Sequence, residues 1–185
     1  MSQTTKKAIA ASLKKLVTKK SLSNISINDI AEDCGITRQT FYYHFTDIYD
    51  LIEWIFTSEA TMVINGEKTY DTWQEGFLHI FQYVLSNKAF VKSAYHSISR
   101  DQLERYLYNE TYNLLIDVVE EKAAQLSVKA EDKKFIADFY KYGFAGLLLE
   151  WIRTGMTEEP ALIIERLDTL IHGDIEKALQ KFKSW

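Results

Sequence analysis

The sequence predicts an all-α protein, and three observations lead to this prediction. Turn-forming residues are scarce, with 7 Gly and 1 Pro in 185 residues, where average usage predicts roughly 13 and 9. Apolar residues recur at helical spacing along most of the chain. No apolar run approaches the roughly 18 residues of a membrane span, so we expect no membrane partner.

The amino-terminal segment and the cysteine content point to the cytoplasm. Residues 1–20 are charged and helical in pattern, without the apolar core of a secretory signal. The single Cys34 can form neither an internal disulfide nor a cysteine-rich zinc site. Its spacing places it on the apolar face of a short helix, which predicts a small buried residue and not a nucleophile.

Charge is distributed unevenly along the chain. Residues 1–45 carry a net charge of +4, and the remaining 140 residues carry −8. A small basic head on a larger acidic body is consistent with a head that meets phosphate, although a solvated basic face would look the same.

Three helices are predicted in this head. Ile9, Leu13 and Val17 form one apolar stripe of a helix over 3–20. Ser26, followed by an acid three residues later, indicates the N-cap of a short helix over 27–34.

Gly35 suits the left-handed residue that ends a helix, and Thr37 can cap the next one over 38–43. Two short helices that meet at a tight turn form a helix-turn-helix, whose second helix must dock through Phe41 and Phe45. Its outward face combines hydrogen-bond donors, a methyl group and aromatic hydroxyls, namely Arg38, Gln39, Thr40, Tyr42, Tyr43 and His44. Such a surface fits a major groove, and the alternative is a solvated helical corner.

The segments 26–31 (SINDIA) and 35–45 (GITRQTFYYHF) resemble the DNA-binding signature of TetR-type transcriptional regulators. The resemblance implies a helix-turn-helix domain over 1–46, and a helical effector-binding and dimerisation domain over 47–185. It also implies homodimers on pseudo-palindromic double-stranded operators. The expected DNA-binding residues are Ser26, Asn28, Thr37, Arg38, Gln39, Thr40, Tyr42, Tyr43 and His44. One departure is Ile48, where many members have a Lys that contacts phosphate.

The body is predicted to contain helices over 47–64, 72–86, 88–97 and 100–125, followed by a final apolar pair. The first of the pair, around 135–152, is apolar on nearly every side, which indicates packing against both its own core and a partner. The second is expected to run from Pro160 to Phe182. Two such helices from each subunit would make a four-helix interface, although a monomer with one large core is the alternative. The expected interface residues are Gly143, Leu147, Ile163, Leu167, Leu170, Ile171 and Ile175.

Aromatic residues at inward-looking positions are the candidate effector ligands, although such a stripe is more often ordinary core packing. They are Trp73, Phe77, Phe81, Phe90, Tyr95, Tyr106, Tyr112, Phe139 and Trp151. His79 and His96, with Glu75 one turn before His79, lack the local spacing of a zinc site, so we expect neither a metal nor a cofactor.

Two further segments, 87–91 and 146–153, are similar to a Gram-positive subgroup of the TetR family that includes an activator of dihydroxyacetone-kinase genes. This similarity introduces activation, or control by a partner protein, as an alternative.

The motifs of common enzyme classes are missing: there is no Gly-x-Ser-x-Gly, no phosphate-binding Gly-x-x-x-x-Gly-Lys and no Gly-x-Gly-x-x-Gly. We therefore expect no enzyme, but a DNA-binding transcriptional regulator, a repressor released by an unknown small-molecule effector. The alternatives are an activator or co-regulator controlled by a partner protein or metal, and a helical adaptor that does not bind DNA.

Overall fold

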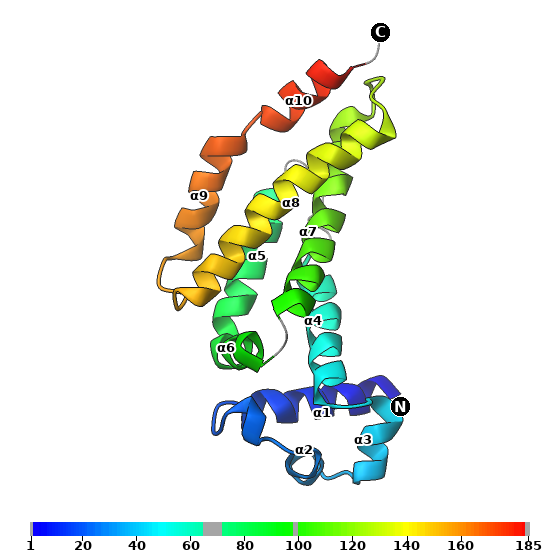
Figure 1. Ribbon diagram of the computed structural model, residues 1–185, viewed down its shortest axis with the longest axis vertical. Helices are drawn as coiled ribbons and strands as arrows, with labels where there is room; N and C mark the ends of the chain where they lie inside the picture. The colour runs from blue at the N-terminus through cyan, green and yellow to red at the C-terminus, as the bar shows by residue number, and fades with distance from the viewer. Residues whose placement is uncertain (1, 65–71, 98–99, 184–185) are drawn as a thin grey trace. The chain divides into compact units, whose positions relative to one another are not determined.

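The computed structural model describes residues 2–64, 72–97 and 100–183, and every regular element within these ranges is a helix. The predicted all-α class is therefore confirmed. The chain divides into two compact units, residues 1–59 with 87–103 (unit 1) and residues 60–86 with 104–185 (unit 2). Figure 1 shows the helices in chain order, coloured from blue to red.

Unit 1 begins with the helix-turn-helix and the helix before it. The elements are α1 (Ser2–Leu16), the 3-10 helix η1 (Leu22–Asn24), α2 (Ile27–Asp33) and α3 (Arg38–His44). The first helix is shorter than predicted, because the segment after Leu16 continues as turns and then as η1.

The expected caps are present at both ends of α2. The Ser26 hydroxyl accepts a hydrogen bond from the Asp29 amide at 3.2 Å, and the Asp29 carboxylate accepts one from the Ser26 amide at 2.7 Å. This reciprocal capping box satisfies two amides that have no partner within the helix. Gly35 adopts φ +68° after α2, and the Ile36 amide then donates to the Ala31 carbonyl at 2.9 Å. The helix-turn-helix is thus fixed by local hydrogen bonds.

The core of unit 1 joins these helices to α4 (Ile48–Ile64) and α6 (Lys88–Ser97). Phe41 and Phe45 are 0% and 2% exposed, which confirms them as head core. The α4 residues Leu51, Ile52 and Ile55 are fully buried. The helix α3, too short to persist alone, is held by this packing.

Unit 2 contains α5 (Trp73–Ser86), most of α7 (Arg100–Ala123), α8 (Ala130–Arg153), α9 (Pro160–Ile171) and α10 (Asp174–Phe182). Helix α9 packs against α5, and α10 packs against α8 and α9. The prediction of one helix from Pro160 to Phe182 is wrong. The chain breaks at Gly173, whose φ of +75° is left-handed, and α10 starts in a new direction.

Candidate nucleic-acid interface

Helix α3 is fixed by a side-chain cap at its first turn. The Thr37 hydroxyl accepts a hydrogen bond from the Thr40 amide at 3.1 Å, and the two threonine hydroxyls lie 2.9 Å apart. Both hydroxyls therefore already take part in a bond that stabilises the helix start. Of the two threonines, Thr37 is the more exposed.

The outward face of α3 is open to solvent. Arg38 and Gln39 are exposed, and Tyr42 and Tyr43 are 49% and 82% exposed. Within the described parts of the chain, Arg38 makes no hydrogen bond or ion pair, so its guanidinium donors are available to a ligand. His44 is half-buried, with its ring edge-to-face against Tyr43 at a centroid distance of 5.0 Å.

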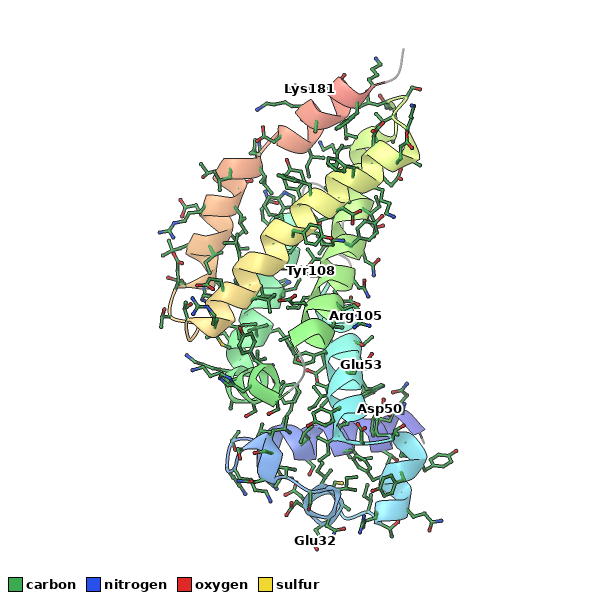
Figure 2. The ribbon with its side chains drawn as sticks, viewed as in Figure 1. Glu32, Asp50, Glu53, Arg105, Tyr108 and Lys181 are labelled. Atoms are coloured by element: carbon green, nitrogen blue, oxygen red, sulfur yellow. The ribbon has the colours of Figure 1, made fainter. Side chains whose placement is uncertain are left out.

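The two expected DNA-binding residues of α2 have different surroundings. Ser26 is exposed, but its hydroxyl is engaged in the capping box described above. Asn28 is exposed and lies in the first turn of α2. Figure 2 shows Glu32, on the same helix, pointing outward from the unit.

Much of the positive charge of the head is paired within unit 1. Lys15 contacts Asp33 at 2.5 Å, and Lys20 contacts Asp29 at 2.9 Å. The hydrogen bond from Lys20 is the main cause that lowers the pKa of Asp29, and the bond from Lys15 lowers the pKa of Asp33. These pairs neutralise two of the seven basic side chains of residues 1–45, and the net charge of +4 already counts the two acids involved.

Lys14 connects three helices of unit 1, a role that the apolar pattern of α1 did not indicate. Its ammonium group forms an ion pair with Glu59 of α4 and donates to the Asn87 side chain at 3.0 Å, just before α6. It also lies 5.6 Å from the centre of the Phe90 ring. The Lys14 side chain is only 21% exposed, so these contacts form in a partly dehydrated setting.

Acidic residues at the start of α4 serve as caps. The Asp47 carboxylate accepts from the Asp50 amide at 2.8 Å, and the Asp50 carboxylate accepts from the Thr46 amide at 2.8 Å. Figure 2 labels Asp50 at this end of α4. Next to them, Ile48, the departure noted in the sequence, is half-buried.

Cys34 is half-buried and its thiol donates to the Ile30 carbonyl at 2.9 Å. Burial raises the pKa of this thiol, which keeps it protonated and a poor nucleophile.

Most candidate effector ligands pack against other aromatic rings. Phe77 stacks on Phe144 at 4.0 Å between ring centres, Trp73 meets Phe144 edge-to-face at 5.6 Å, and Phe81 lies 5.0 Å from Trp151. All five rings are at most 5% exposed. In this structure they form a filled core, which is the alternative that the sequence left open.

The other effector candidates differ in exposure. Phe90, in unit 1, is buried against Phe56 at 5.3 Å between ring centres, and Tyr95 is half-buried. Tyr106 is half-buried in unit 2. Phe139 was expected to face inward, but it is 66% exposed, because it lies on the side of α8 opposite the buried residues.

Tyr112 belongs to a cluster around a lysine of α8. The Lys141 ammonium lies 4.6 Å from the ring centre of Tyr142, 5.5 Å from that of Tyr112 and 6.0 Å from that of Tyr108. It also contacts Asp138 at 2.6 Å. Figure 2 labels Tyr108 on α7. Cation–π contacts of this kind tie α7 to α8.

Helix α8 has two apolar sides. One side is buried in unit 2, whereas the other forms an exposed stripe, defined by Phe135, Phe139, Tyr142, Gly143, Gly146 and Leu147. A methyl group at Gly143 or Gly146 would meet no atom of the described chain within 4 Å. Close approach of another helix of the same chain therefore does not explain these glycines.

The expected interface residues fall into two groups. Gly143, Leu147 and Leu170 are exposed, with Leu170 at 70%, and Ile171 is half-buried. The other residues are 2–8% exposed in the core of their own unit: Ile163, Leu167 and Ile175. Ile175 lies on α10, because the helix breaks before it.

His79 and His96 are both exposed, on α5 and α6 respectively. Among the described residues no three His, Cys, Asp or Glu side chains are grouped so that they could hold a metal ion. No helix in the described ranges is long and apolar enough to span a membrane.

Two family models match the chain. Residues 9–55 match "Bacterial regulatory proteins, tetR family", and residues 71–173 match "Transcriptional regulator C-terminal region". The HTH-type dhaKLM operon transcriptional activator DhaS of Lactococcus lactis subsp. lactis (strain IL1403) is 28% identical over 157 residues, which cover 84% of this chain and 83% of the relative.

Solved structures share the fold. The dihydroxyacetone kinase operon activator DhaS superposes with a TM-score of 0.76 at 24% identity, covering 97% of this chain and 98% of that chain. NalD, the secondary repressor of the MexAB-OprM efflux pump in Pseudomonas aeruginosa, superposes with a TM-score of 0.62 at 16% identity, covering 92% and 95%.

Proposed function

Since the chain belongs to the TetR family of bacterial regulatory proteins, we propose that it binds a pseudo-palindromic operator as a homodimer through α3. The family matches also confirm two predictions: the chain is a DNA-binding transcriptional regulator, and it is not an enzyme.

The observation that carries the proposal is the free, exposed Arg38 on a capped helix. Arg38 lies directly after the Thr37 cap, and the buried Phe41 anchors the opposite side of α3. Because the Arg38 guanidinium has no ion pair to break among the described residues, it is well suited to form hydrogen bonds to the edge of a guanine, as Arg does in major grooves. Tyr42 and Tyr43 would add hydroxyl contacts to phosphate.

The exposed stripe of α8 supports the dimer. Phe135, Phe139 and Tyr142 are 64%, 66% and 57% exposed, a set of large apolar side chains that a monomer would leave in water. Leu162 and Leu170 of α9 are also exposed, at 45% and 70%. We propose that these two helices meet their copies around a two-fold axis. We further propose that the two α3 helices of the dimer enter successive major grooves.

For the sign of regulation we propose activation of an operon. This proposal rests on the similarity to DhaS, which is named as an activator and which superposes better than the repressor NalD. The packed aromatic core is consistent with control by a partner protein, because no ring there is left open to a small effector. Repression relieved by a small molecule is the second candidate, and it is the function expected from sequence.

Fluorescence anisotropy on labelled DNA from upstream of the gene itself, against scrambled DNA over a salt series, tests the operator proposal. We expect binding of order 10⁻⁸ M with roughly 10³-fold preference. Arg38→Ala should weaken specific binding by about 1–3 kcal/mol and relax base preference. Arg105→Ala, which removes an exposed arginine of unit 2 (Figure 2), is the matched control and should bind as wild type.

Equal weak binding to both DNAs by the wild type, or an unchanged affinity for Arg38→Ala, would contradict the proposal. A promoter–reporter fusion with and without the gene then measures the sign. Lower expression after deletion supports activation, and higher expression supports repression.

A further inference from the structure

A surface depression in unit 1 lies apart from the α3 surface. It measures about 600 Å³ and is formed by η1 with its flanking residues, the first turn of α4 and the second half of α6 (the η1–α6 pocket). Its volume falls within the roughly 300–1,000 Å³ of small-molecule sites. Figure 1 shows η1 at the end of α1 away from α3.

The charge of the η1–α6 pocket has one sign. Lys92 and His96 line it from one face of α6, and no acidic side chain is among its lining residues. In the described parts of the chain Lys92 has neither an ion pair nor a hydrogen bond, although it is half-buried. An ammonium group with three free donors in a partly dehydrated depression favours an anion.

Hydroxyl groups complete the lining. Ser21 and Ser23 line the pocket from the η1 side, and Ser93 and Ser97 line it from α6. The Ser21 and Ser23 hydroxyls lie 3.1 Å apart and share one hydrogen bond, so the hydroxyl that accepts it keeps its own proton for a ligand. Serine hydroxyls together with a lysine are typical partners of phosphate oxygens, because several short donors can converge on one tetrahedral group. The same pocket is lined by Leu22, which is buried and gives an apolar wall for the body of a ligand.

We propose that the η1–α6 pocket binds a small phosphate monoester, with the phosphate between Lys92 and His96 on α6 and Ser21 and Ser23 at η1. Such a ligand would bridge α6 and the turn that precedes α2, and so would restrain the start of the helix-turn-helix. The site stands independently of the proposed operator binding, because its ligand contacts none of the α3 residues.

Nuclear magnetic resonance of the full chain labelled in histidine tests the site directly. The chain contains four histidines, and only His96 lines this pocket. Titration with glycerol phosphate in a phosphate-free buffer should shift the His96 ring signals and leave His44, His79 and His172 unchanged. Glycerol and sodium chloride at equal concentration should have no effect.

Two variants distinguish binding in the pocket from a general effect of positive charge on α6. Lys92→Met should weaken glycerol phosphate binding by about tenfold or more, the effect of losing one charge-assisted hydrogen bond. Lys88→Met removes a cation one turn earlier on the same helix and outside the lining, so binding should stay within about twofold of wild type. No His96 shift, or equal effects of the two variants, would overturn the proposal.

A DNA titration distinguishes a free phosphate ester from the phosphates of an operator. Without glycerol phosphate, Lys92→Met should leave the salt dependence of DNA binding unchanged. If the variant instead lowers the salt slope by about one and glycerol phosphate does not shift His96, the lysine contacts DNA and the small-ligand site is overturned.

Discussion

Replacement of Gly143 by alanine should have opposite effects on the subunit and on the proposed dimer. Gly143 lies in the exposed stripe of α8, where an added methyl group meets nothing within 4 Å among the described residues of its own chain. Alanine favours the helix over glycine by about 0.5–1 kcal/mol, so the free energy of unfolding of one subunit should rise by that amount.

The proposed dimer should become weaker, because the methyl group would stand in the stripe that we propose packs against its copy. Overpacking costs about 1–3 kcal/mol, and a two-fold interface contains the change twice. The gain in helix propensity is the same in the free and the paired subunit and cancels. Even about 2 kcal/mol in total raises the dimer dissociation constant roughly 30-fold.

Sedimentation equilibrium measures the dissociation constant of Gly143→Ala, and urea unfolding followed by circular dichroism measures subunit stability. Asn109→Ala is the control, because it also improves helix propensity at an exposed position of α7 outside the stripe. It should stabilise the subunit and leave the dimer unchanged. A Gly143→Ala dimer as tight as wild type would show that this part of α8 lies outside the interface.

Three further changes test other parts of the structure. Phe139→Ala, at a side chain 66% exposed, should weaken the dimer by up to roughly 3 kcal/mol per subunit, while Leu85→Ala on α5 should not, as sedimentation equilibrium would show. Lys14→Met should lower the free energy of unfolding by about 1–2 kcal/mol. Lys15→Met, at a side chain 55% exposed, is the control and should lower it by less than about 0.5 kcal/mol. Equal losses of unfolding free energy for the two variants in urea would contradict the connecting role of Lys14. Asp29 has a lowered folded pKa, so its contribution is present above the unfolded value of about 3.9 and is lost as pH falls through the folded pKa. Urea unfolding from pH 7 to pH 3 should therefore show that Asp29→Asn is less stable than wild type, and that this difference in the free energy of unfolding narrows below about pH 4. A difference that stays constant over this range would refute the stabilising role of the Asp29 carboxylate.

The head could be predicted closely from sequence because its structure is locally encoded. The Ser26 and Thr37 caps and the left-handed Gly35 each act within a few residues, and all three are present. The contacts of Lys14 with Glu59 and Asn87 span 45 and 73 residues, and no local pattern carries that information.

The body was harder to predict, because helical periodicity does not reveal a break when the apolar residues keep their helical spacing across it. Ile171 and Ile175 are four residues apart, so the apolar pattern continues across Gly173 as if one helix ran through. Periodicity also cannot say which of two apolar sides is the core. On α8 both Phe139 and Phe144 look internal in sequence, but Phe139 is exposed and Phe144 is 3% exposed.

The two sides of α8 connect the aromatic core to the exposed stripe. A compound that inserts between Phe77 of α5 and Phe144 of α8 must separate rings that stack at 4.0 Å, and so must displace α8 or rearrange its side chains. The same helix carries Phe139 and Gly143 on its outer side, so a compound that displaces α8 also changes the surface offered to the proposed second subunit. Coupling between two binding events is reciprocal. A compound that displaces α8 in this way should therefore change the dimer dissociation constant by the same factor by which dimerisation changes the affinity for the compound. Sedimentation equilibrium with and without the compound measures that factor.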